Sequence, residues 1–209
     1  MTIKTLILST SILVSGSVAF ADTGFYLGGN ISYSEASSTF RSSFESTENT
    51  AAIGLTLGYR FEKGTAFFGP EADIDLFLNS DFEDSNGIPC TIRASAPYYC
   101  ERDATIRLRG VYGQSLNNGL EWFGTAGIGF MTGKGAVGPG PASRDRGVSS
   151  GVTVSLGLQK ALSERTMLRG EIIYDDFSHS VTKPTDPGGF VADPSYQATT
   201  FKIGYILKF

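Results

Sequence analysis

The sequence predicts an all-β protein, a transmembrane antiparallel up-and-down β-barrel of eight strands. Three observations lead to this prediction. In residues 201–209, apolar and other side chains alternate, and the chain ends on the aromatic residue Phe209. Seven earlier segments alternate in the same way, which places one face of each strand against an apolar medium. Short and long connections follow each other in turn, as in a barrel with short periplasmic turns and long extracellular loops.

The chain begins with the features of a secretory signal peptide. Lys4 supplies a positive charge, residues 6–18 form an apolar run, and Ala19 and Ala21 complete an A-x-A cleavage site. The alternative is a membrane anchor, but the run is shorter than the roughly 20 apolar residues that a spanning helix requires. We therefore expect a signal peptide over 1–21 and one outer-membrane barrel domain over 22–209.

The composition favours strands and turns and excludes several classes of protein. The 209 residues include 26 glycines and have a mean hydropathy of −0.02. No later stretch is apolar enough to span a membrane as a helix, so further membrane contact must come from alternating strands. Without Lys4 the formal net charge of −4 becomes about −5, and no basic patch is present, so nucleic acid is not an expected partner.

The first four segments are expected over 24–34, 51–61, 66–78 and 103–115. In each, every second residue is mostly apolar or aromatic, the period of a strand with one face toward lipid. The lipid-facing sets are Phe25, Leu27, Ile31 and Tyr33; Ile53, Leu55, Leu57, Tyr59 and Phe61; Phe68, Ala72, Ile74, Leu76 and Leu78; and Ala104, Ile106, Leu108, Gly110 and Tyr112. Each segment is at least about as long as the 9 to 11 residues that a tilted membrane strand requires.

The last four segments show the same period. The fifth and sixth are marked by residues 122–130 and 152–158, and the others cover 166–177 and 201–209. Their lipid-facing sets are Trp122, Ala126, Ile128 and Phe130; Val152, Val154, Leu156 and Leu158; Leu168, Ile172 and Tyr174; and Phe201, Ile203, Tyr205, Leu207 and Phe209. Aromatic residues near both ends of these sets predict two girdles at the membrane surfaces. The alternative is a soluble barrel of lipocalin type, but so much apolar surface would aggregate in water.

The connections between the segments alternate in length. Three short turns are expected at 62–65, 116–119 and 161–165, and Asn118-Gly119 in the second is a strong hairpin signal. The four long polar connections between them are 35–50, 79–102, 132–147 and 178–196. With both termini in the periplasm, all four long loops are expected outside the cell.

The polar faces of the strands predict a charged lumen. The inward side chains expected to form a charge network are Arg60, Glu71, Asp73, Asp75, Arg107, Arg109, Glu121, Arg169, Glu171 and Lys202. An eight-stranded barrel is only wide enough for its own side chains, and an unpaired buried charge is costly. We therefore expect these charges to pair across the ladders and largely fill the lumen. The alternative is a narrow ion path lined by the same side chains.

The only two cysteines, Cys90 and Cys100, lie close together in the sequence. In an exported chain such a pair predicts one local disulfide, with a free or metal-bound pair as the alternative. The bond would restrain the second long loop by about 2 to 3 kcal/mol. Tyr98 and Tyr99 lie in this span, and exposed tyrosines bind at low entropic cost. We expect this loop to recognise a host, phage or envelope partner, unless it serves only to resist proteases.

Two stretches resemble known patterns. Residues 168–177, Leu-Arg-Gly-Glu-Ile-Ile-Tyr-Asp-Asp-Phe, follow the alternating stretch 151–160. They resemble the Leu-Arg-x-Glu-Tyr-x-Tyr-x-Asp-Phe pattern of the small outer-membrane barrel family of opacity-protein and porin-like type, with an OmpA- or OmpX-like eight-stranded barrel, familiar in alphaproteobacteria. Ile172-Ile173 stands where that family often has Tyr-Arg. The chain end also resembles the C-terminal signature of bacterial outer-membrane proteins. That resemblance implies an assembly signal, read by the barrel assembly machinery, at Phe201, Ile203, Tyr205, Leu207 and Phe209.

These features imply a protein of the outer membrane of a Gram-negative bacterium, in contact with membrane lipid and lipopolysaccharide. We expect a structural or surface-interaction role through the extracellular loops; a porin-like channel for small solutes is the alternative. A third possibility is a lipid-modifying enzyme, because Asp175, Ser178 and His179 cluster at a loop end. Successive strand side chains point to opposite faces, so His179 is expected to be an exposed loop residue. We expect no catalytic site, metal site or cofactor.

Overall fold

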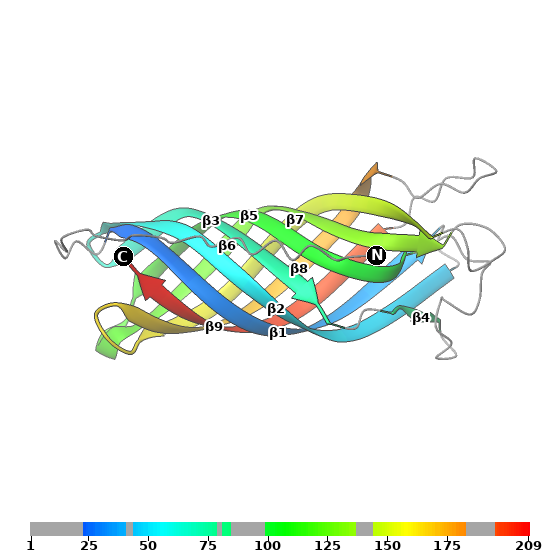
Figure 1. Ribbon diagram of the computed structural model, residues 1–209. Helices are drawn as coiled ribbons and strands as arrows, with labels where there is room; N and C mark the ends of the chain where they lie inside the picture. Colours follow the sequence, from blue (N-terminus) through cyan, green and yellow to red (C-terminus); the bar gives the residue numbers. More distant parts are fainter. Residues whose placement is uncertain (1–22, 41–43, 79–80, 85–98, 137–143, 183–194) are drawn as a thin grey trace, which may run out of the picture.

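Eight long antiparallel strands close into a barrel in the computed structural model of the chain (Figure 1), which describes residues 23–40, 44–78, 81–84, 99–136, 144–182 and 195–209. The barrel strands are β1 (Gly24–Phe40), β2 (Phe44–Lys63), β3 (Ala66–Phe77), β5 (Tyr99–Ser115), β6 (Leu120–Ala136), β7 (Arg144–Ala161), β8 (Thr166–Thr182) and β9 (Ser195–Lys208). The short strand β4 (Glu83–Asp84) pairs with β2, and the 3-10 helix η1 (Asn117–Gly119) joins β5 to β6. Within the described ranges, no helix is long and apolar enough to cross a membrane. The predicted fold class is confirmed.

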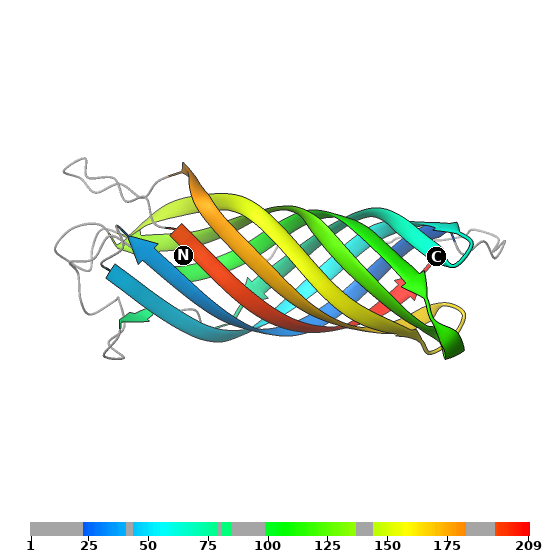
Figure 2. The same ribbon diagram turned by 180° about the vertical axis from the view of Figure 1, so that it is seen from behind.

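Each barrel strand pairs with the next one along the chain, and β1 and β9 close the ring (Figure 2). Ile31 on β1 lies opposite Ile53 on β2 and Ile203 on β9, so these side chains share one row of the outer wall. The last residue is held in place by the first strand: the Phe209 N–H donates a hydrogen bond to the Phe25 carbonyl (2.9 Å). Closure leaves no sheet edge in lipid, where unpaired backbone groups have no partner.

The outer wall is apolar over a continuous band. The side chains predicted to face lipid all lie on this wall, and even the last residue, Phe209, is 63% exposed. Near the turns, the rings of Phe61 and Phe68 stack with their centroids 5.5 Å apart, which forms part of an aromatic girdle. The band ends at Tyr33 on β1, because the next outward residue on that strand is the exposed Glu35. The band therefore marks the part of the barrel that spans the membrane.

The three short turns all lie at the end of the barrel where the chain terminates (Figure 1). Gly64 joins β2 to β3 with a φ of 66°, and the β5–β6 turn contains Asn118 at 62° and Gly119 at 70°. Positive φ is readily adopted by glycine and tolerated by asparagine, which explains the hairpin signal in the sequence. In the β7–β8 turn, the Leu162 N–H donates to the Thr166 carbonyl (2.9 Å). Because short turns are periplasmic in this class of barrel, we call this the periplasmic end and the other the loop end.

The expected bounds of the long loops were wrong, because the strands continue well beyond the apolar band. Of the predicted loop 35–50, all but residues 41–43 belongs to β1 and β2. The strands likewise extend into the other three connections. In the first of these, β5 begins at Tyr99; in the second, β6 ends at Ala136 and β7 begins at Arg144; in the third, β8 ends at Thr182 and β9 begins at Ser195. Above the band the outward side chains are no longer regularly apolar, so the hydropathy signal disappears while the strand persists. On β1, residues 35–40 project the wall by about 14 Å, allowing for strand tilt.

The lumen also contains apolar layers that the alternation did not predict. Phe67, Val111 and Phe123 form one buried cluster near the periplasmic end, and Tyr26, Met167 and Ile206 form another. Glycines on the neighbouring strands make room for these large side chains. A Cβ added at Gly58 would lie 2.2 Å from the Tyr26 ring, and one added at Gly157 would lie 2.3 Å from the Phe123 ring. The interior is therefore a packed core and not only a charge network.

Candidate functional site

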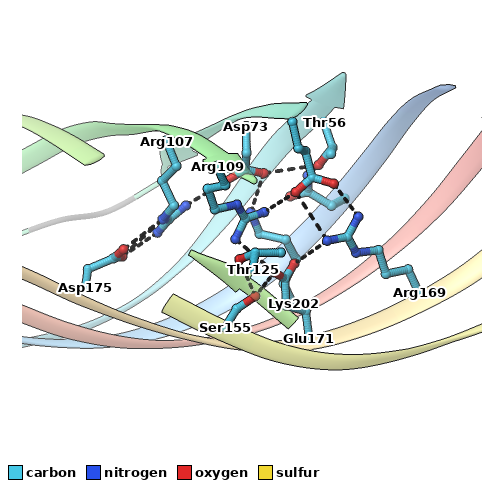
Figure 3. A network of polar contacts seen from close by, with 12 residues as sticks. Thr56, Asp73, Arg107, Arg109, Thr125, Ser155, Arg169, Glu171, Asp175 and Lys202 are labelled. Carbon is cyan, nitrogen blue, oxygen red and sulfur yellow. Dashed lines mark hydrogen bonds and ion pairs between the residues drawn. The ribbon is translucent and has the colours of Figure 1, made fainter. Parts of the chain in front are cut away.

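The centre of the lumen is organised around Arg107 on β5, whose side chain is fully buried (Figure 3). Its guanidinium donates to Asp175 on β8 through Nε and Nη2, at 3.0 and 2.6 Å. Nη1 donates to Asp73 at 2.8 Å and to Asp75 at 2.6 Å, both on β3. Lys202 on β9 reaches the same two aspartates, at 2.6 and 2.9 Å. One arginine thus links the opposite walls of the barrel through three carboxylates.

A second layer of charge lies next to the first and is centred on Glu71. Its carboxylate accepts hydrogen bonds from Arg109 (2.6 Å), Arg169 (2.5 Å) and the Tyr26 hydroxyl (2.7 Å). Arg109 also donates to Glu171 at 2.8 Å, so Arg109 bridges two carboxylates (Figure 3). Charged hydrogen bonds of this kind are stronger than neutral ones and fix the geometry of the guanidinium groups. The layer closes the lumen between β3, β5 and β8.

The third charged group lies at the periplasmic end. Arg60 forms a two-pronged pair with Glu121, with both N···O distances at 2.8 Å, and donates to Glu62 at 2.5 Å. Gln159 donates to Glu121 at 2.6 Å, and the Arg60 guanidinium lies 3.7 Å from the centre of the Phe67 ring. The apolar clusters described above separate this group from the Glu71 layer. All ten charged residues named from the sequence therefore lie on the inner wall, and each contacts at least one opposite charge within the network.

The loop end of the lumen has a polar cluster that the sequence reasoning missed. Arg102 on β5 is fully buried, forms an ion pair with Glu48 at 3.1 Å and donates to the hydroxyls of Ser34 and Tyr196. Its guanidinium lies 3.5 Å from the centre of the Phe77 ring. Glu48 lies beyond the apolar band, and burial raises the pKa of its carboxyl to about 7 although Arg102 acts in the opposite direction.

Arg102 was missed for two reasons. It was expected in a loop, and its position two residues before the outward Ala104 would turn it outward in a regular strand. A shift of register between Arg102 and Ala104 turns it into the lumen instead. The signal that could have found it is its place between Glu101 and Asp103, in a charged triplet next to the start of the expected strand 103–115.

Apolar side chains pack in the lumen next to this cluster. Phe82, next to β4, is fully buried and lies against Tyr196, with ring centroids 6.3 Å apart. Phe177 stacks on Tyr196 with ring centroids 5.6 Å apart, and Met131 belongs to the same cluster. Because β3 ends at Phe77 while its neighbours continue, the segment 81–84 occupies the place where β3 would have extended.

A small cavity in the described part of the barrel lies near the periplasmic end, between Tyr26, Arg60 and Arg169, and measures about 10 Å³. This is room for about one water molecule. Along its described length, the lumen thus contains four charged groups, apolar clusters between them and an aromatic cluster near the loop end.

Some expected sites lie outside what the structure describes. Cys90 is outside the described residues, and only the backbone of Cys100 is placed, in β5, so the disulfide stays a prediction. The backbone of His179 belongs to β8 and lies opposite Ser150, whereas its side chain is not described. Across the described ranges, no group of three or more histidine, cysteine or acidic residues could hold a metal ion. The cleavage site and signal peptide also lie outside these ranges.

Comparison with known proteins identifies the class of this barrel. A family model described as the outer membrane protein beta-barrel domain matches residues 5–209. The chain therefore belongs to this family and is a protein of the cell outer membrane. No curated protein sequence matches the chain.

Solved structures of the same fold share little sequence with it. OprG from Pseudomonas aeruginosa matches with a TM-score of 0.58 and 16% identity, over 89% of this chain and 96% of that one. Neisserial surface protein A (NspA) matches with a TM-score of 0.54 and 14% identity, over 89% and 97%. Ail of Yersinia pestis, solved with the heparin analogue sucrose octasulfate, matches with a TM-score of 0.50 and 13% identity, over 89% and 99%. At these identities the likeness concerns the fold alone.

Proposed function

We propose that this chain is a closed outer-membrane barrel that acts at the cell surface through its loop end and does not pass solutes. The observation that supports closure best is Arg107, which is fully buried while it bonds to carboxylates from two walls of the barrel. A solute would have to separate these pairs and then pass the apolar layers. Breaking one buried pair costs about 3 to 5 kcal/mol, which makes spontaneous opening rare.

Swelling of liposomes that contain the folded protein tests this closure. In solutions of small sugars or amino acids, we expect the swelling rate of protein-free liposomes. A general porin reconstituted in the same lipid serves as the positive control. Swelling well above the protein-free rate would show that the lumen conducts and would favour the porin-like channel instead.

At the loop end, the strands project beyond the apolar band and present a surface to which a partner can bind. By sequence, the connections and strand ends at this end (34–50, 79–103, 132–147 and 176–199) contain twelve acidic and seven basic residues, a formal charge of −5. Glu35, Asp81 and Glu83 are among the exposed acidic side chains. Ail binds an anionic heparin analogue, but this surface favours a neutral or cationic partner, because like charges repel. Recognition through the loop that holds Cys90 and Cys100 belongs to the same proposal.

Two probes of opposite charge test the surface reading. Vesicles in which the loop end of the protein faces outward are expected to bind poly-L-lysine at low salt and not to bind heparin. The variant with Glu35, Asp81 and Glu83 changed to glutamine is expected to lose much of the poly-L-lysine binding. Glu164→Gln, at an exposed acidic residue of the periplasmic end, is the control and is expected to leave poly-L-lysine binding unchanged. Heparin binding as strong as poly-L-lysine binding would contradict the proposal.

We also propose that the chain has no catalytic role. The structural relatives with the same fold are outer-membrane barrel proteins, and Ser178 and His179 are adjacent in the sequence, a spacing that does not favour a paired Ser-His site on a strand. Incubation of the folded protein with phospholipid, followed by analysis for released acyl chains, tests this. Release that is lost in His179→Ala would overturn it.

A further inference from the structure

One part of the lipid-facing wall is hollowed, around β3. The hollow measures about 570 Å³, within the range of roughly 300 to 1,000 Å³ that is typical of small-molecule sites. Its lining residues on the outer wall include Leu57, Pro70, Ala72, Leu108 and Ile128. Ala72 lies directly between Leu57 and Leu108 in the register, and Leu108 lies opposite Ile128. A short side chain between larger ones thus forms the floor of the hollow.

Pro70 makes this part of the wall unusual. It lies inside a strand that has neighbours on both sides, whereas proline in sheets is normally confined to edges and bulges. The register between β2 and β3 omits the pairs that would join Tyr59 to Pro70 and Arg60 to Gly69. The residue opposite Pro70 on the other side is Gly110, which has no side chain to fill the wall. The hollow therefore coincides with an interruption in the ladder.

The side chains between the hollow and the periplasmic rim follow the order of a phospholipid molecule. Along the outer face of β2, the hollow residues Leu57 and Tyr59 are followed by Phe61 of the aromatic girdle and then by the exposed Lys63. Lys63 lies four residues beyond Tyr59, about 13 Å along the strand. That is comparable to the distance between a headgroup phosphate and the upper part of its acyl chain. A lysine just outside the apolar band is well placed for an anionic phosphate.

We propose that this face binds one phospholipid of the periplasmic leaflet, with an acyl chain in the hollow and its phosphate at Lys63. The apolar floor lies in the membrane band, so an apolar chain is the natural occupant, and the charge at the rim selects a molecule that also has an anionic group. The acyl chain covers Pro70 and the interrupted ladder, where two pairs between β2 and β3 are missing.

Native mass spectrometry of the folded full-length protein, extracted from bilayers of phosphatidylethanolamine and phosphatidylglycerol, tests the site. We expect one retained phospholipid per barrel. Ala72→Phe fills the hollow with its ring and is expected to lower retention about tenfold, which corresponds to about 1.4 kcal/mol. Its control is Gly170→Phe on the outer wall of β8, where an added Cβ meets nothing within 4 Å.

The headgroup contact is tested separately, which covers the case in which Ala72→Phe fails to fold. Lys63→Gln is expected to lower retention about two- to fivefold, as for an exposed ion pair. Lys160→Gln, another exposed lysine at the same rim on β7, is expected to leave retention unchanged. The proposal is overturned if no phospholipid is retained, or if the two control variants lose it equally. It is also overturned if a second copy of the chain occupies the face, seen as a dimer that Ala72→Phe dissociates.

Discussion

Replacing Arg107 by methionine tests whether the lumen is held by charge pairing. Arg107 contacts three carboxylates, but two of them, Asp73 and Asp75, also contact Lys202. Asp175 forms its ion pair with Arg107, and within the described part of the chain no second cation pairs with it. Arg107→Met therefore leaves one buried carboxylate without a counter-charge. Breaking a buried pair in this way costs about 3 to 5 kcal/mol of unfolding free energy.

Lys202→Met is the matched comparison, because it also removes one buried cation. Both of its aspartates keep Arg107, so the loss is limited to charged hydrogen bonds, about 1.5 to 3 kcal/mol. The double variant Arg107→Met/Asp175→Leu removes both partners of a pair and is expected to be more stable than Arg107→Met alone. The order of stability is thus wild type, then Lys202→Met, then Arg107→Met.

Urea unfolding in phospholipid vesicles, followed by tryptophan fluorescence, measures these differences. Trp122 is the only tryptophan and lies on the outer wall in the aromatic girdle, so its emission reports extraction from the membrane. An Arg107→Met variant within about 1 kcal/mol of wild type would refute the pairing argument, since a surface pair costs no more than that. Equal losses in Arg107→Met and Lys202→Met would refute the specific role of Asp175.

Three further predictions concern other parts of the barrel. Gly58→Ala is expected to cost about 1 to 3 kcal/mol of unfolding free energy, because its Cβ would meet the Tyr26 ring, whereas Gly29→Ala, with nothing within 4 Å, is expected to be neutral. Since burial raises the folded-state pKa of Glu48 from 4.5 to about 7, the folded state binds the proton more tightly, and stability falls as pH rises from about 4.5 to 7, by at most about 3 kcal/mol. Glu48→Gln should abolish this slope in urea unfolding at a series of pH values; a slope that persists would assign it to another group. Phe209→Ser is expected to reduce the amount of assembled barrel in cell envelopes, and a normal amount would argue against an assembly signal at this residue.

The sequence predicted the membrane-spanning band well because lipid imposes one strict condition on each strand. Every second side chain must be apolar, so sets such as Leu55, Leu57 and Tyr59 can be assigned to the outer wall without knowledge of their neighbours. The same parity places Arg107 and Arg109 inside, and opposite charges on adjacent strands then predict contacts across the ladder. Their partners on distant strands could not be predicted, because Asp175 meets Arg107 across the lumen and not along a ladder.

The parts that the sequence did not predict are those where the strands need not have an apolar residue at every second position. Beyond the band the outward side chains are no longer regularly apolar, and β1 and β2 continue through residues that resemble a loop. Inside the lumen both apolar and polar side chains are allowed. The alternation of apolar residues along the sequence therefore does not predict that Phe67 and Phe123 are buried there. A bulge inverts parity, which explains why Arg102 escaped notice.

The charge network also determines how the strands pair. Buried ion pairs seldom add more stability than well-packed apolar side chains would, so stability alone does not explain why this barrel contains so many. A slip of one residue exchanges the two faces of a strand. For β5 it would turn Arg107 and Arg109 toward lipid, at a cost of about 2 to 4 kcal/mol for each near the membrane midplane. It would also leave Asp73, Asp75 and Glu71 with fewer counter-charges. The inward charges therefore destabilise wrong registers more than they stabilise the native one. Their alternation along β3 and β5 specifies the strand register more strictly than the apolar face alone would.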